Sequence, residues 1–273
     1  MSRAIGRPRG LAVAITSGKG GVGKTSLAIN LAVSLAGLGH RVGLLDADLG
    51  LGNVDVMLGL TPGAHVGAVL SGERKLSDIA IDGPAGVRVI PAGSGIRAMT
   101  ALTPVLRQRL FDLMDTARAE LDFLLVDTAP GIWDNVLDLA ERADRVVVMT
   151  SYEPTAIVDA YAMAKLLNAA APGRELGIVV NAARHAADGQ SVFHQLDTAA
   201  RRFLKRDLRY YGCIVHDPNV GSAALEQRPV VTQSPNSPAS LCFRRLAIRV
   251  AGWVPDRPVT AAEFERMEAP RCA

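Results

Sequence analysis

Residues 18–25, with the sequence GKGGVGKT, match the phosphate-binding pattern GxxxxGK followed by Ser or Thr at every defined position. An apolar run typical of a buried strand, Leu11–Thr16, precedes the match, and Lys24–Leu38 follows with apolar residues at helical spacing. Between a strand and a helix, the glycines allow backbone N–H groups to face phosphate oxygens, and the helix N-terminus adds partial positive charge. We therefore expect nucleotide contacts from Gly18, Lys19, Gly20, Gly21, Val22, Gly23, Lys24, Thr25 and Ser26.

Two side chains of this loop have specific expected roles. Lys24 is placed to contact the β- and γ-phosphates of a nucleoside triphosphate, and Thr25 to ligate Mg²⁺. The alternative is a glycine-rich turn that binds nothing. The agreement of pattern and context argues against that alternative, so we expect a nucleoside triphosphate and Mg²⁺ as ligands, and the resemblance described below implies that the nucleotide is ATP.

Short apolar runs alternate with longer helical patterns along the rest of the chain. Continuous apolar strands separated by helices predict a doubly wound, mostly parallel α/β sheet with helices on both faces. We expect one P-loop ATPase domain over 11–253, between an N-terminal tail (1–10) and a loosely ordered C-terminal tail (254–273). The expected strands are Leu11–Thr16, Arg41–Leu45, Val87–Pro91, Phe123–Val126, Arg145–Met149, Leu176–Val180 and Tyr211–Val215. The expected helices are Lys24–Leu38, Thr103–Arg118, Pro154–Ala170, Ser191–Lys205 and Ser237–Gly252.

Composition narrows the class of protein. Of the 273 residues, 49% are hydrophobic and 21% are charged, which excludes a disordered chain. The net charge of +3 argues against a polycationic nucleic-acid binder, and the 4% of aromatic residues argues against a base-stacking one. The three cysteines, Cys213, Cys242 and Cys272, form no CxxC pair, so a disulfide framework or a cysteine metal site is not expected. We expect a cytoplasmic protein, since no signal peptide and no apolar run of about 20 residues is found.

Three aspartates follow or end predicted strands. Asp46 and Asp48 come after the second strand, where two carboxylates suit contacts to Mg²⁺-bound water and to an attacking water; a turn or capping pair is the alternative. Asp127 ends the apolar run FLLVD, the Walker B pattern, and should hold Mg²⁺ through water. The predicted metal residues are thus Thr25, Asp46 and Asp127.

The loop carries a second lysine, Lys19, and the run KGGVGKT resembles the deviant Walker A motif of MinD/ParA-type P-loop ATPases. The resemblance implies that Lys19 reaches the partner's nucleotide across a homodimer while Lys24 contacts its own, and that Asp48 positions the hydrolytic water. These three residues are the expected catalytic ones. It further implies that Asn181 reads the adenine edge and that Asp217 contributes to nucleotide binding, although a strand-end Asn is often only a turn residue.

Further stretches resemble the FlhG/FleN/YlxH group, which sets flagellar number and position: Leu44–Leu60, Ile90–Met99 and Tyr211–Val231. The group implies ATP-driven dimerisation, slow and partner-stimulated hydrolysis, and partners such as a flagellar SRP-type GTPase, switch-complex proteins or a transcription regulator. Membership of this group would also allow the protein to bind peripherally at the cell pole or at the inner face of the membrane. The tail has two apolar anchors, Phe264 and Met267, among three glutamates, so we expect weak membrane binding or none.

Two alternatives remain. A partitioning ATPase with ATP-dependent nonspecific DNA binding would use the basic stretch Arg201–Arg209, which is otherwise a solvated helix face. The sequence DTAPG at 127–131 is closer to the general ParA form than to the flagellar group. An iron–sulfur cluster carrier shares the loop, but the cysteine spacing argues against it.

Overall fold

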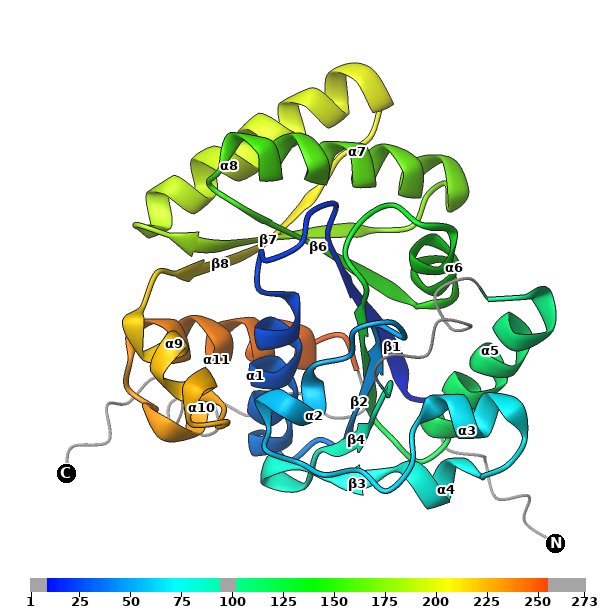
Figure 1. Cartoon of the computed structure of the whole chain (residues 1–273). Helices are drawn as coiled ribbons and strands as arrows, with labels where there is room; N and C mark the ends of the chain where they lie inside the picture. Colours follow the sequence, from blue (N-terminus) through cyan, green and yellow to red (C-terminus); the bar gives the residue numbers. More distant parts are fainter. Residues whose placement is uncertain (1–8, 94–101, 255–273) are drawn as a thin grey trace, which may run out of the picture.

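The computed structural model describes residues 9–93 and 102–254, which form an eight-stranded sheet with helices on both faces (Figure 1). The strand order is β3-β4-β2-β5-β1-β6-β7-β8. In this described part β3 runs antiparallel to β4, and the other neighbouring strands are parallel. The strands are β1 Leu11–Thr16, β2 Val42–Ala47, β3 Ile81–Asp82, β4 Arg88–Ile90, β5 Phe123–Thr128, β6 Arg145–Ser151, β7 Leu176–Ala183 and β8 Arg209–Val215.

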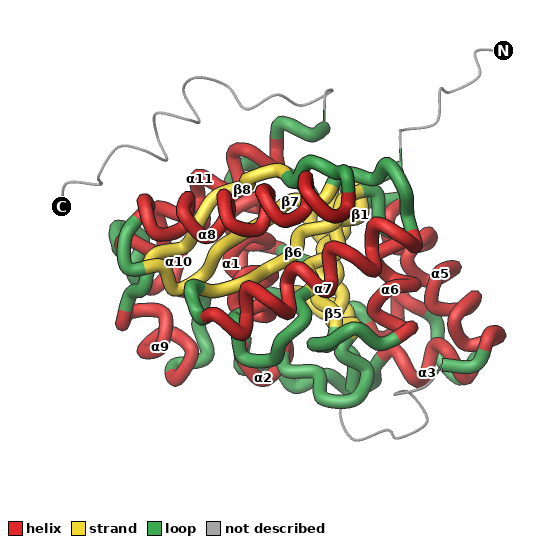
Figure 2. Tube along the Cα trace, turned by 90° about the horizontal axis from the view of Figure 1, so that it is seen from above, coloured by secondary structure: helices red, strands yellow, loops and turns green. Residues whose placement is uncertain are grey.

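Helices cover the sheet in two layers, which confirms the predicted doubly wound α/β fold (Figure 2). Helices α3 and α5–α8 pack on one face, and α1, α10 and α11 on the other. The helices are α1 Lys24–Gly37, α2 Val54–Met57, α3 Val66–Ser71, α4 Leu76–Ile79, α5 Pro104–Arg118, α6 Asp134–Arg142, α7 Pro154–Ala170, α8 Ala186–Ala199, α9 Pro218–Leu225, α10 Val230–Gln233 and α11 Pro238–Ala251. Short 3₁₀ and π segments are η1 Pro84–Gly86 and η3 Ala200–Leu204.

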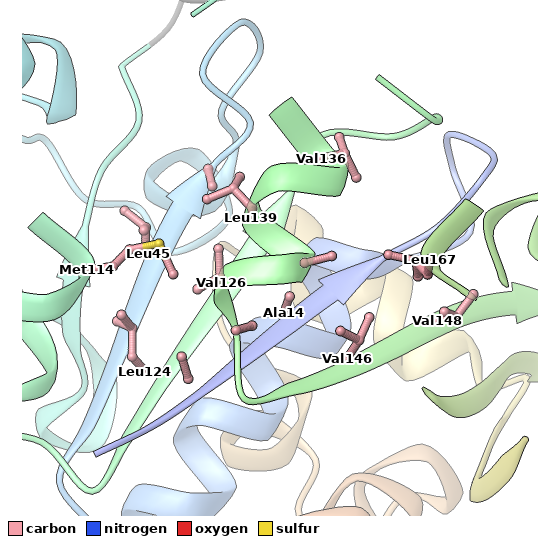
Figure 3. Close-up of a cluster of buried hydrophobic side chains, with 14 of the residues drawn as sticks. Ala14, Leu45, Met114, Leu124, Val126, Val136, Leu139, Val146, Val148 and Leu167 are labelled. Carbon is pink, nitrogen blue, oxygen red and sulfur yellow. The ribbon is translucent and has the colours of Figure 1, made fainter. Parts of the chain in front are cut away.

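The central strands are apolar along their length because each faces a helical layer on both sides. All residues of β5 are buried, and side chains of β1, β2, β5 and β6 interlock with those of α5, α6 and α7 in the cluster of Figure 3. Buried polar residues gather where the strands end: Thr16, Asp46, Asp127, Thr128, Thr150 and Ser151. The ligand-binding edge of an open α/β sheet is this carboxyl edge.

The seven expected strands and five expected helices are present; β1 and α7 have the expected bounds, and the others have shifted ends. Strands β2 and β5 extend beyond the apolar run, because the register pairs Asp46 with Asp127 and Ala47 with Thr128. Asp46 therefore lies inside a strand and not after it. The helix expected at Ser191–Lys205 begins earlier, at Ala186, and ends in η3. Elements without a sequence-based expectation have two to nine residues, too few for a clear periodicity: α2, α3, α4, α6, α9, α10 and β3.

Several expectations fall outside the described residues. They concern most of the tail 1–10, nearly all of the tail 254–273 with Phe264 and Met267, and the second half of Ile90–Met99. Within the described ranges, no helix is long and apolar enough to cross a membrane.

Candidate functional site

The phosphate loop joins β1 to α1 at the carboxyl edge of the sheet. Gly21 and Gly23 have φ of 75° and 96°, in the left-handed region that a residue with a Cβ rarely adopts. Gly23 precedes α1, and a Cβ there would lie 2.4 Å from Nδ2 of Asn181. Glycine is thus required at this position by both backbone conformation and close approach.

Lys24 is buried at the start of α1, and its Nζ donates a hydrogen bond to Oγ of Ser17 at 3.0 Å. Burial lowers the pKa of Lys24, while the negative charges of Asp127 and Asp48 act in the opposite direction. A desolvated ammonium beside the loop would gain favourable interactions from phosphate oxygens. Its placement fits the predicted contact to the β- and γ-phosphates, and that contact stays a prediction.

Asp46 and Asp127 are neighbours across β2 and β5. Burial raises the pKa of Asp46 to about 7, with a further contribution from the charge of Asp127. Its Oδ1 accepts the backbone N–H of Asp48 and its Oδ2 that of Val54, both at 3.1 Å. Asp46 therefore anchors both ends of the loop that carries Asp48, which is the turn or capping role given above as the alternative, and its metal role stays a prediction.

Asp127 has the features of a magnesium ligand. Burial raises its pKa to about 6, against a hydrogen bond from Thr25 and the charge of Lys24. Its Oδ1 is buried and has no hydrogen-bond partner among the described residues. An unsatisfied carboxylate oxygen beside a threonine hydroxyl fits a hard cation that takes oxygen ligands. The chemistry of Thr25 and Asp127 thus fits Mg²⁺, and their role as metal ligands stays a prediction.

Asp48 lies in the segment between β2 and α2, half-buried and close enough to Lys24 to act on its pKa. Its Oδ1 accepts the backbone N–H of Leu51 at 3.2 Å. This turn holds the carboxylate at the carboxyl edge of the sheet. The position is compatible with the predicted contact to an attacking water.

Lys19 does not turn back toward its own loop. Its Nζ donates to Oε2 of Glu153 at 2.7 Å and to Oγ1 of Thr155 at 3.0 Å, at the start of α7. The Oγ of Ser17 donates to the carbonyl oxygen of Lys19 at 2.6 Å. Lys19 thus differs from Lys24 in direction and partners. Sequence reasoning missed Glu153 and Thr155, because nothing in the local sequence links them to a lysine 134 residues away.

Asn181 reaches the phosphate loop from β7. Its Nδ2 donates to the carbonyl oxygen of Val22 at 2.8 Å, and the next residue, Ala182, has φ of 53°. A register shift between β7 and β8 occurs at this point. Such irregularities redirect side chains beside binding sites. Asn181 therefore lies beside the phosphate loop, while its contact with the base stays a prediction.

Asp217 caps α9. Its Oδ1 accepts the backbone N–H of Asn219 and its Oδ2 that of Ala239, both at 3.0 Å. Burial opposes ionisation, but these hydrogen bonds keep the pKa of Asp217 below its usual range. Asp217 thus has a capping role in the structure. Its contact with a nucleotide stays a prediction.

In the basic stretch at 201–209, Arg201 and Arg209 have carboxylate partners within the chain. Arg201 contacts Asp197 at 2.7 Å and Asp207 at 3.3 Å. Arg206 donates to Asn168, and Arg209 lies 3.8 Å from a carboxylate. These partners favour a solvated face over a phosphate-binding one. Among the described residues there is also no group of three or more His, Cys, Asp or Glu side chains arranged to hold a metal.

Comparisons with known proteins match nearly the whole chain. The family model ParA, described as NUBPL iron-transfer P-loop NTPase, matches residues 10–251. The antiactivator FleN of Pseudomonas aeruginosa is 43% identical over 253 residues, covering 92% of this chain and 90% of FleN. The flagellum site-determining protein YlxH of Helicobacter pylori is 31% identical over 251 residues, 92% and 83% of the two chains. The structure resembles that of the septum site-determining protein MinD of Pyrococcus horikoshii complexed with Mg-ADP, with a TM-score of 0.77 and 22% identity. The match covers 92% of this chain and 99% of the MinD chain, and it shows that the two proteins share a fold.

Proposed function

Because this chain belongs to the ParA/MinD family of P-loop ATPases, and within it is similar to the flagellar regulators FleN and YlxH, we propose that it binds Mg·ATP, dimerises and hydrolyses ATP slowly to regulate flagellar number or placement. The observation that supports this chemistry is that Asp48 and Asp127 lie close enough to Lys24, in the phosphate loop, for their charges to act on its pKa. The 43% identity to FleN carries the flagellar role. We treat residues 11–253 as one ATPase domain.

The residues have separate tasks in this proposal. The loop N–H groups and Lys24 bind the phosphates, and Thr25 and Asp127 hold Mg²⁺, which would offset phosphate charge when bound. Asp48 orients the attacking water toward the γ-phosphate. Asp46 keeps the segment around Asp48 in place through its two backbone hydrogen bonds.

The direction of Lys19 supports a dimer in which it serves the partner's nucleotide. In the single chain its ammonium is held by Glu153 and Thr155, away from the nearby phosphate loop. Large apolar side chains are exposed after β2, β5 and β6, at the same edge of the sheet: Leu51 72%, Ile132 50%, Trp133 70% and Tyr152 48%. Apolar side chains gathered around a nucleotide site suit an interface that closes when ATP is bound.

We further propose a cytoplasmic protein whose hydrolysis is stimulated by a partner. A flagellar SRP-type GTPase, switch-complex proteins and a transcription regulator are the candidate partners, and peripheral placement at the cell pole or membrane is compatible with each of them. The carboxylate partners of Arg201 and Arg209 make nonspecific DNA binding the weaker alternative.

The biochemical test compares four proteins at equal concentration: the wild type, Lys24→Ala, Lys19→Ala and Asp48→Ala. We expect ATP binding to be lost in Lys24→Ala. Lys19→Ala should bind ATP and stay monomeric, whereas Asp48→Ala should bind ATP and accumulate as a dimer. Light scattering and phosphate release measure these outcomes. An Asp48→Ala protein with wild-type hydrolysis would contradict the role of Asp48.

The cellular test counts flagella by electron microscopy in the native host with and without the gene. A changed number or position with normal chromosome inheritance supports the flagellar role. Unchanged flagella with failed inheritance would support partitioning and leave the ATPase proposal standing. Salt-dependent DNA binding that requires ATP would point the same way.

A further inference from the structure

Gln227 adopts a backbone conformation that its side chain disfavours. Its φ is 55°, in the left-handed region. Helix α9 ends just before it: the N–H of Gln227 bonds the carbonyl oxygen of Ala224, and that of Arg228 bonds Ala223. The position after such a helix end is usually glycine, because a Cβ is unfavourable there. A glutamine at this position therefore calls for a compensating role of its side chain.

That side chain reaches across to α2. Nε2 of Gln227 donates to the carbonyl oxygen of Val56 at 2.8 Å, between residues 171 apart in sequence. Gly59 lies against the same side chain, and a Cβ on it would be 3.2 Å from Oε1 of Gln227. The contact spans one side of a cavity of about 520 Å³, lined in part by Leu58 and Pro229. Gln227 thus links two surface segments that a groove would otherwise separate.

The segment that Gln227 holds is the one that carries Asp48. Helix α2 begins at Val54, whose N–H bonds Asp46. The N–H of Asp48 bonds the other oxygen of Asp46. Asp46 therefore fixes residues 48–54 from the sheet side, and Gln227 fixes Val56 from the opposite side. Val54 and Leu58 also pack in the hydrophobic core, so loss of the second contact would loosen the exposed side of α2 and, through it, the position of Asp48.

The other side of the contact is attached to the phosphate-loop helix. The N–H of Val231, in α10, bonds Oδ1 of Asn30 at 3.2 Å, and Nδ2 of Asn30 bonds the carbonyl oxygen of Ser26 at 2.8 Å. Ser26 belongs to the first turn of α1. Hydrogen bonds therefore join α10 to the first turn of α1, and the short stretch of chain from Gln227 to Val231 connects α10 to the contact with α2.

We propose that Gln227 is a positioning residue for ATP hydrolysis: its hydrogen bond to Val56 holds the segment 48–59 against α9 and α10, so that Asp48 is fixed relative to the phosphate loop. The proposal rests on the ATPase activity proposed above. Gln227 acts through Asp48 and needs no contact with the nucleotide. Its loss should lower kcat and leave ATP affinity unchanged, since the phosphate loop keeps its own contacts.

Three substitutions of the full-length protein separate this role from a structural one. Gln227→Gly removes the hydrogen bond and relieves the backbone, so its Tm should equal or exceed that of the wild type. Gln227→Glu keeps the size of the side chain and removes the donor. Gln227→Lys restores a donor of similar reach. Glu226→Gln, at the exposed neighbouring position, is the matched control.

Single-turnover hydrolysis, Kd for Mg·ATP and Tm are measured for each variant, with amide exchange over residues 48–59. In the Gly and Glu variants kcat should fall about threefold to tenfold, which is the effect expected from the loss of one hydrogen bond. Their backbone amides at 48–59 should exchange faster than those of the wild type. Their Kd should stay within about twofold of the wild type, and the Lys variant and the control should keep near-wild-type kcat.

Three results would overturn the proposed positioning role. A Gln227→Gly protein with wild-type kcat shows that the contact does not position Asp48, while the ATPase proposal stands. A Lys variant as slow as the Gly variant shows that the donated hydrogen bond is not the cause. A wild-type protein that binds but does not hydrolyse ATP overturns the ATPase proposal itself, and the positioning role with it.

Discussion

The pH dependence of stability offers a direct test of the burial of the Asp46 carboxyl group in the nucleotide-free protein. The carboxyl group is 1% exposed, and burial raises its pKa from 3.8 to about 7. The folded protein therefore keeps a proton on Asp46 that the unfolded chain has already lost between these two pH values. The free energy of unfolding must then fall as the pH rises through this window, and the contribution of Asp46 becomes constant above about pH 7.

The size of the effect follows from the shift. One pKa unit corresponds to about 1.4 kcal/mol, so a shift of about three units corresponds to about 4 kcal/mol over the whole window. Between pH 5 and pH 7 the expected loss is about 3 kcal/mol at most. Asp127, whose pKa is raised to about 6, adds a change of the same sign.

The assay is urea unfolding of the nucleotide-free protein at half-unit steps from pH 5 to pH 8. Asp46→Asn cannot ionise, so its curve of unfolding free energy against pH should be flatter than that of the wild type by up to about 3 kcal/mol over this range. The amide also replaces one hydrogen-bond acceptor by a donor, which should lower stability by about 1–3 kcal/mol at every pH. Glu73→Gln on the exposed surface is the control. Parallel curves for the wild type and Asp46→Asn would refute the reasoning.

Three further predictions concern the core, the loop and the proposed interface. Leu125→Ala, at a fully buried position of β5, should cost about 2–5 kcal/mol in urea unfolding, and a cost under about 1 kcal/mol would contradict the packing described. Asn181→Ala removes the hydrogen bond to Val22, so ATP should bind about threefold to tenfold more weakly in a fluorescent-nucleotide titration. An unchanged Kd would show that this hydrogen bond does not support the loop in ATP binding. In a Trp253→Phe background the remaining tryptophan, Trp133, should shift its emission to shorter wavelength with Mg·ATP and not with Mg·ADP, and equal spectra would exclude its burial in an ATP-dependent interface.

Much of the fold could be predicted because it depends on local patterns. The phosphate loop, the apolar strands and the long helices are each encoded in consecutive residues. Elements such as α2, α4 and β3 have four residues or fewer, and packing on the sheet decides their structure. The start of α8 at Ala186, earlier than expected, lies in a stretch without regular apolar spacing.

In the candidate site, too, some features could be predicted from the sequence and others could not. The sequence by itself determined the residue types at the nucleotide edge, because Lys24, Thr25 and Asp127 follow directly from a loop and a strand end. It could not show that Asp46 anchors the Asp48 segment, since two carboxylates of one short stretch look alike until the N–H groups around them are placed.

The tertiary structure alone decided the contacts between distant segments. Lys19 bonds Glu153 across 134 residues, and Gln227 bonds Val56 across 171. A local pattern carries no information about such pairs, because they form only when the strand order brings the ends of separate βα units to one edge of the sheet. The sequence thus determined which chemistry is available at that edge, and the packing of the sheet determined which groups hold it in position.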